Sequence, residues 1–143
     1  MHMGIRTAVV ALLSAAPALS GIPIVANRRR PMPQAVDRQV FVYLEDSLST
    51  RGAMHGAPFE WATRIRVECV ARDTAGANAD VNADALQAAV YAALLANVTL
   101  SGLVFDADPK ALAWTEDEAD TTVSACQAIY SVWHQTAGNV LTA

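Results

Sequence analysis

The sequence predicts a single-domain α+β fold, in which two helices pack on an antiparallel or mixed β-sheet of about four to five strands. Its 143 residues fit one domain. Two segments with helical apolar spacing stand among β-branched segments. Consecutive strands joined by short turns favour such a sheet with helices packed on it. We expect the domain to span 4–143 and interpret Met1-His2-Met3 as a cloning remnant, which leaves His2 out of every candidate site.

The first expected element is an amphipathic helix near the N-terminus, ended by Pro17. Residues 7–20 also carry an Ala-Pro-Ala sequence that imitates a signal-peptidase site, so a secretory signal is the alternative. A domain helix is favoured because only one arginine precedes the run and because its apolar residues form one helical stripe: Ile5, Val9, Leu12, Leu13 and Ala16.

Three strands are expected next, at 21–26, 39–45 and 61–73. Residues 46–58 contain two glycines, two serines and a proline, which predicts a flexible surface loop. The third strand alternates in polarity, so one of its faces should join the core and the other should meet water or a charged partner. Its core face is Ile65, Val67, Cys69 and Ala71, and its polar face is Arg64, Arg66, Glu68 and Arg72.

A second helix follows, capped by Asn82 or Asp84 and stopped near Asn97. Its apolar stripe is Leu86, Val90, Ala93, Leu94 and Val98. After an acidic turn within 102–110, a strand is expected at 111–115 and a long central strand at 121–134. The predicted order is helix, strand, strand, strand, helix, strand, strand.

The composition excludes several classes of protein. Hydrophobic residues make up 53% of the chain and charged residues 17%, which excludes a disordered tail. The net charge of −4 argues against a protein that grips nucleic acid through phosphates. No stretch approaches 18 apolar residues, so no membrane span is expected. A low-charge, apolar chain must cover surface somewhere, and self-association is the favoured explanation.

The inventory of reactive residues predicts no enzyme, no metal site and no cofactor. The sequence has no HExxH, GxGxxG, GxxxxGK or GxSxG motif, and no histidine stands beside a nucleophile in sequence. Cys69 and Cys126 are interpreted as buried thiols on strands.

Acidic residues form two groups, Asp106 with Asp108 around one turn, and Glu116, Asp117, Glu118 and Asp120. They are interpreted as solvated turns or as a negative face that meets a channel or a basic partner. The enzymatic alternative would use Asp106, Asp108 or Glu116 as an acid or base.

The basic cluster Arg28, Arg29 and Arg30 is closed by two prolines, which exclude a helix there. It is interpreted as a subunit or partner contact, because arginine is enriched at interfaces. The candidate counterparts are acidic: Asp106, Asp108, Glu116 and Glu118. A solvated loop and a weak nucleic-acid patch are the alternatives.

The layout resembles the tail terminator (minor tail protein U-like) family of long-tailed bacteriophages. The resemblance is carried by IRTAVVALLSAAPAL, PIVANRRRPMP, QVFVYLED, RIRVECVARD and NADALQAAVYAALLAN leading into VTLSGLVFDAD. Ala83-Asp84-Ala85-Leu86 and Leu100-Ser101-Gly102-Leu103 occupy the places of two recurring family patterns. It covers about Gly4 to His134, and the Gly-rich loop from Ser47 to Pro58 departs from it, so no contact residue is carried over there.

The resemblance implies a structural virion protein without a catalytic site or cofactor. Family members form a hexameric ring that caps the tail tube, stops its polymerisation and offers a docking surface to the head. The implied partners are further copies of the chain, the tail tube protein and a head-completion protein, with DNA passing through the lumen unbound. Assembly in the host cytoplasm would precede incorporation into the virion. The alternatives are a head-tail (neck) completion protein and a secreted or periplasmic binding domain.

Overall fold

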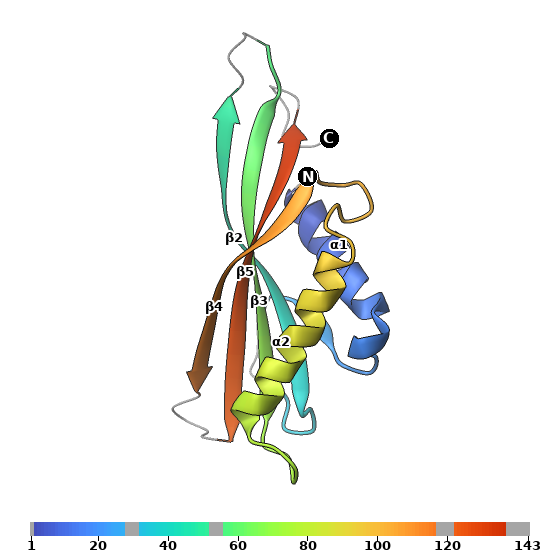
Figure 1. The fold of residues 1–143 in the computed structure, drawn as a ribbon, viewed down its shortest axis with the longest axis vertical. Coiled ribbons are helices and arrows are strands. Elements are labelled where there is room, and N and C mark those ends of the chain that lie inside the picture. The colour runs from blue at the N-terminus through green and yellow to red at the C-terminus, as the bar shows by residue number, and fades with distance from the viewer. Residues whose placement is uncertain (1, 28–31, 52–55, 117–121, 137–143) are drawn as a thin grey trace.

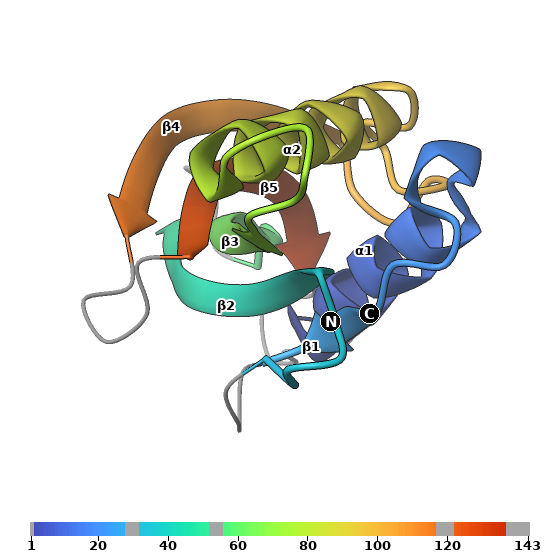
Figure 2. The ribbon, with the colours of Figure 1, turned by 90° about the horizontal axis from the view of Figure 1, so that it is seen from below.

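The computed structural model describes residues 2–27, 32–51, 56–116 and 122–136. A five-stranded sheet forms one layer and two helices form the other, and both helices lie on the same side of the sheet (Figures 1 and 2). We call the other side of the sheet the open face. The predicted α+β class is therefore confirmed, and the sheet is mixed.

The chain begins with helix α1 (His2–Ala15), followed by a 3₁₀ turn η1 (Pro17–Leu19). The predicted stripe is the buried side of α1, where Ile5, Val9 and Leu13 lie in the main core. The helix ends just before Pro17, as expected, because proline has no N–H to continue the helical ladder.

Three strands follow in the order that the sequence predicts: β1 (Ile24–Ala26), β2 (Arg38–Arg51) and β3 (Phe59–Arg72). The short β1 pairs parallel to β2, and β2 pairs antiparallel to β3. The prediction of a loop over 46–58 is wrong in its first part, because 46–51 continue β2 opposite β3. Backbone pairing between the two strands outweighs the weak strand preference of the serines there. Figure 1 shows this end of the hairpin extending beyond both helices.

Strand β3 has the two faces that its alternation predicts. Ile65, Val67 and Cys69 are buried in the main core beneath the helices. The open face carries Arg64 and Arg66.

Helix α2 (Ala79–Leu95) begins earlier than predicted. Its N-cap position is Asn78, while the Asp73 carboxylate accepts a hydrogen bond of 2.6 Å from the backbone N–H of Ala79. Asn82 lies inside the helix and its side-chain amide donates to the carbonyl oxygen of Arg72 at 2.9 Å. The start is fixed by contacts to the end of β3, so a search for capping residues next to the apolar stripe misplaces it.

The last two strands are β4 (Asp106–Glu116) and β5 (Val123–Thr136). The sheet order is β1-β2-β3-β5-β4, so β5 is an interior strand, as predicted, and β4 is an edge. The predicted turn around Asp106 and Asp108 is wrong, because both residues lie in β4. A register shift between Pro109 and Ala111 accommodates the proline, which cannot donate a ladder hydrogen bond.

The core lies between the helices and the sheet, with contributions from α1, α2 and all the strands except β1. Cys69 and Cys126 face each other across β3 and β5 as free, buried thiols, which confirms their predicted interpretation. No helix among the described residues is long and apolar enough to span a membrane.

Candidate functional site

A groove opens between α2 and β4, above β5, with a volume of about 510 Å³. Its floor comes from Ala128 and Tyr130 of β5. Its walls are the α2 residues Asp84, Gln87, Ala88 and Tyr91 and the β4 residues Pro109, Lys110, Ala111 and Leu112. The lining is mostly apolar, with a few polar groups, which is the usual make-up of a binding surface.

Strand β4 leaves large apolar side chains exposed beside this groove. Leu112 is 53% exposed and Trp114 is 56% exposed. The indole N–H of Trp114 donates to the Asp84 carboxylate at 3.2 Å, which positions the ring toward α2. Pro109 and Lys110 protect the first half of this edge in the way edge strands commonly do, but 111–115 contain neither a charge nor a proline.

Gln87 places a polar group in the wall of the groove. The residue is 3% exposed, and its Nε2 donates to the Tyr130 hydroxyl at 3.2 Å. Its Oε1 has no hydrogen-bond partner among the described residues. Burial raises the pKa of Tyr130 to about 12, so its phenol stays protonated at neutral pH. An unpaired buried acceptor is costly unless a partner group reaches it.

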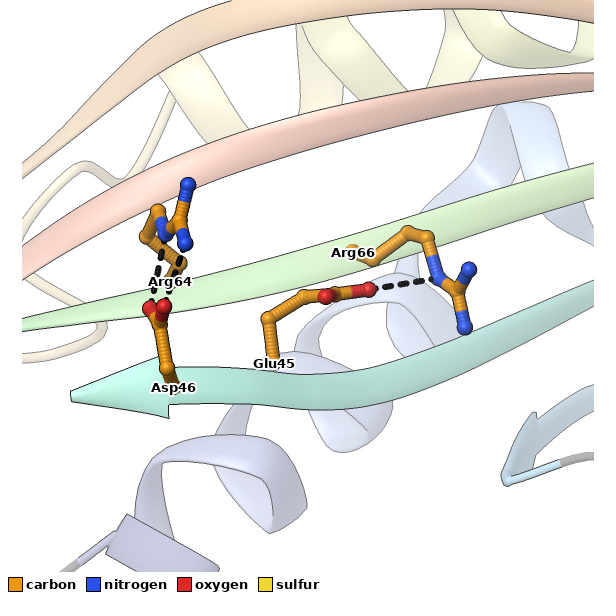
Figure 3. A network of polar contacts seen from close by, with 4 residues as sticks. All are labelled: Glu45, Asp46, Arg64 and Arg66. Carbon is orange, nitrogen blue, oxygen red and sulfur yellow. Dashed lines mark hydrogen bonds and ion pairs between the residues drawn. The ribbon is translucent and has the colours of Figure 1, made fainter.

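The open face of the sheet is charged, and its charges are paired locally (Figure 3). Arg64 Nε donates to Asp46 at 2.7 Å, and Arg66 pairs with Glu45 at 2.9 Å. The hydrogen bond from Arg64 lowers the pKa of Asp46. The Arg66 guanidinium also lies 4.4 Å from the centre of the Tyr43 ring. These pairs hold β2 to β3 and leave little net charge on this part of the face.

The fold assembles a polar chain that sequence spacing does not reveal. His134 Nε2 lies 2.8 Å from the Thr63 hydroxyl, which lies 2.7 Å from the Ser47 hydroxyl, and Ser47 in turn lies 3.0 Å from His2 Nε2. The exclusion of His2 from consideration is therefore wrong, since its ring also packs on Trp61.

This polar chain is unsuited to catalysis. His134 and Thr63 are each 1% exposed, so no substrate can reach the imidazole-hydroxyl pair. Burial, and then the proximity of His2, lowers the pKa of His134 to about 4, so the ring is neutral at pH 7. We interpret the chain as a buried structural network.

The other reactive groups give no chemical site in the described part of the chain. Burial raises the pKa of both thiols, Cys126 to about 11 and Cys69 further, which makes them poor nucleophiles. Within the described ranges, no group of three or more histidine, cysteine, aspartate or glutamate side chains could hold a metal ion.

Three of the predicted interface residues lie on one strand, but they do not form one cluster. Asp106 and Asp108 are exposed near the start of β4, where Asp108 pairs with Lys110 at 2.6 Å. Glu116 ends the same 11-residue strand, ~30 Å away at ~3.3 Å per residue. The acid-base pairing that an enzyme would need is therefore absent from these three residues. Arg28, Arg29, Arg30 and Glu118 lie outside the described residues.

The groove was not predicted from the sequence, although one signal for it exists. Gln87 occupies a buried position beside Leu86 and Val90 on the apolar stripe of α2. A polar residue at such a position indicates a buried hydrogen-bond partner. Which partner it meets depends on β5 lying under α2, and that follows from the sheet order alone.

Comparison with known proteins gives two structural likenesses. No family model matches the chain, and no curated protein matches it. A chain from the virion of a native gene transfer agent particle is 15% identical, with a TM-score of 0.38, over 90% of this chain and 84% of that one. A chain from the sheath/tube terminator of an extracellular contractile injection system, in its extended state, is 13% identical, with a TM-score of 0.48. The second match covers 100% of this chain, which spans 61% of that neighbour's length.

Proposed function

We propose that this chain is a structural protein of a phage-like tail, a terminator that closes into a ring on the end of the tail tube. The proposal joins two separate supports. The sequence pattern resembles the tail terminator family over most of the chain. The molecule also exposes an apolar groove and edge, and a lone domain would not keep these open to water without a use for them.

The exposed groove beside β4 is the observation that carries the proposal. A protein that acts alone blunts its sheet edges with charges, prolines or covering segments. Here Leu112 and Trp114 are more than half exposed on an edge strand. A protein that assembles with copies of itself needs such a surface, and a ring supplies a covering copy to every member.

In this proposal six copies form the ring, which stops growth of the tube and offers the opposite surface to a head-completion protein. DNA passes through the lumen without specific contacts, as suits a chain with a net charge of −4. The ring assembles in the host cytoplasm and stays in the virion. No bond-making chemistry is assigned to it, since the exposed carboxylates of β4 are too far apart to act as a pair.

Electron microscopy of purified tail tubes mixed with the protein tests the proposal. We expect a ring at one end of each tube and tubes that no longer elongate when tube protein is added. Rings bound only at the head portal would instead assign the chain to the neck. A protein that never binds tubes or portals, at any concentration, would exclude both assignments.

A further inference from the structure

We propose that the groove between α2 and β4 seats a second copy of this chain, which presents its positively charged flank formed by α1, β1 and β2. This inference deepens the proposed function by naming the acceptor surface and its occupant. It rests on the groove and on how charge is divided between the two sides of the sheet.

The chain divides into a positive and a negative part. Residues 1–72 carry nine arginines and five carboxylates, a net charge of +4. Residues 73–143 carry one lysine and nine carboxylates, a net charge of −8. A division of this size steers two copies toward unlike surfaces and opposes contacts between like ones.

The fold keeps the two parts on separate sides of the molecule. The order β1-β2-β3-β5-β4 places the strands of 1–72 on one side and those of 73–143 on the other, without interleaving. The helices follow, because α1 packs on β1 and β2 while α2 packs on β3, β5 and β4. The charge division of the sequence therefore becomes a division in space.

The groove lies on the negative side. Helix α2 and strand β4 together carry five carboxylates and one ammonium group: Asp80, Asp84, Asp106, Asp108, Glu116 and Lys110. On the other side, Arg64 and Arg66 are held by Asp46 and Glu45, which leaves the positive surplus toward α1 and β1. Arg28 to Arg30 follow β1 in the sequence and add to that surplus.

The lining of the groove suits a protein surface. The exposed Leu112 and Tyr91 offer apolar contact at its two walls. Gln87 Oε1 has no partner among the described residues and can accept an N–H or O–H from the incoming copy. A central apolar contact with a polar group to fix its register is the usual anatomy of an interface.

Contact between two different surfaces of the same chain is head-to-tail, and it propagates from copy to copy. Such contacts generate closed rings when the rotation closes and open filaments when it does not. The same groove would then be filled in every member of a ring, which accounts for its apolar lining.

Sedimentation velocity of the full chain, without tail tubes, tests the inference with Ala88→Arg. Ala88 is exposed on α2 and lines the groove, so arginine there fills it without touching the core. Ala85→Arg is the matched control, because Ala85 is exposed on the same helix and lies outside the groove lining. We expect Ala88→Arg to weaken self-association at least about tenfold, as for a central interface residue. The control should stay within about twofold, since exposed substitutions cost little.

A mixing experiment tests the head-to-tail arrangement. The Ala88→Arg chain keeps an unaltered positive flank, so it should still bind one wild-type copy, as native mass spectrometry would detect. Failure to form that mixed pair would contradict a head-to-tail contact. Unchanged self-association of Ala88→Arg, or a wild-type chain that stays monomeric as concentrated as its solubility allows, would overturn the inference.

Tube capping separates this inference from the proposed function. If the wild-type chain assembles through the groove but never binds tail tubes, the inference stands and the proposed function fails. If Ala88→Arg assembles and caps tubes like the wild type, the proposed function stands and the groove inference fails.

Discussion

Single residues in this protein take their properties from neighbours that are distant in sequence. His134 is the clearest case, because its ring meets Thr63, 71 residues away, inside the sheet. Burial makes the neutral ring the stable form and lowers its pKa to about 4. A histidine in an unfolded chain titrates near 6.5. The folded state therefore binds fewer protons than the unfolded state between pH 6.5 and 4.

This difference predicts an acid-dependent loss of stability. Since the unfolded chain gains the proton first, the contribution of His134 is fully present above pH 6.5 and is lost as the pH falls through 4. A pKa shift of this size corresponds to about 2–3 kcal/mol of unfolding free energy. Urea titrations of wild type and His134→Gln at pH 7 and pH 4 should show the gap between them narrowing by about that amount.

His2 and the carboxylates titrate in both proteins, so the comparison with His134→Gln isolates one ring. A gap that does not change with pH would mean that His134 is as easily protonated in the folded chain as in the unfolded one.

At the scale of elements, α1 is a working part of the core. Its buried side contributes to the same cluster as the interior strands. Helical propensity alone would not hold a helix of 14 residues in water, so its order depends on that packing.

A pair of alanine substitutions on α1 measures this dependence. Leu13 is 0% exposed and Met3 is 62% exposed on the same helix. We expect Leu13→Ala to lower the unfolding free energy by about 2–5 kcal/mol, because it removes buried methyl groups and leaves a cavity. Met3→Ala should change it by less than about 0.5 kcal/mol. Chemical denaturation of both variants gives the comparison, and equal effects would show that the helix does not depend on this face.

The edge strand β4 has a different role from the other strands. Interior strands bury both faces or pair both edges, whereas β4 pairs only with β5 among the described strands. Its exposed apolar residues add little to the stability of one copy, so substitutions there should affect assembly more than folding.

At the scale of the whole molecule, the division of charge predicts salt-sensitive assembly. Attraction between exposed charges is screened within about 8 Å at physiological ionic strength and more strongly above it. Replacing Arg28, Arg29 and Arg30 with serine removes three positive charges from the positive part of the chain. We expect the triple variant to unfold like the wild type, within about 1 kcal/mol per residue, and to assemble more weakly.

Sedimentation velocity across a salt series checks both parts of this prediction. The wild type should dissociate as salt rises, and the triple variant should show a shallower dependence. Unchanged assembly of the triple variant would assign the triplet to a solvated loop, which is the alternative that its sequence leaves open.

The sequence by itself determined the order of the elements, the two helices and the core side of most of them. These features are local, because the spacing of apolar residues records which side of an element faces the core. Ile65 and Val67 are buried for that reason, and so are Val9 and Leu13. The errors lie where backbone pairing or distant caps decide, as at the end of β2, the start of α2 and the position of Asp106.

Only the tertiary structure decided which distant residues meet. The groove requires α2 to lie over β5 with β4 beside it, and the burial of Gln87 against Tyr130 follows from that arrangement. Strand order and register set these contacts, and neither is encoded in the periodicity of one segment. The sequence holds the charges of both halves of the chain, but the sheet order β1-β2-β3-β5-β4 decides that they face opposite sides.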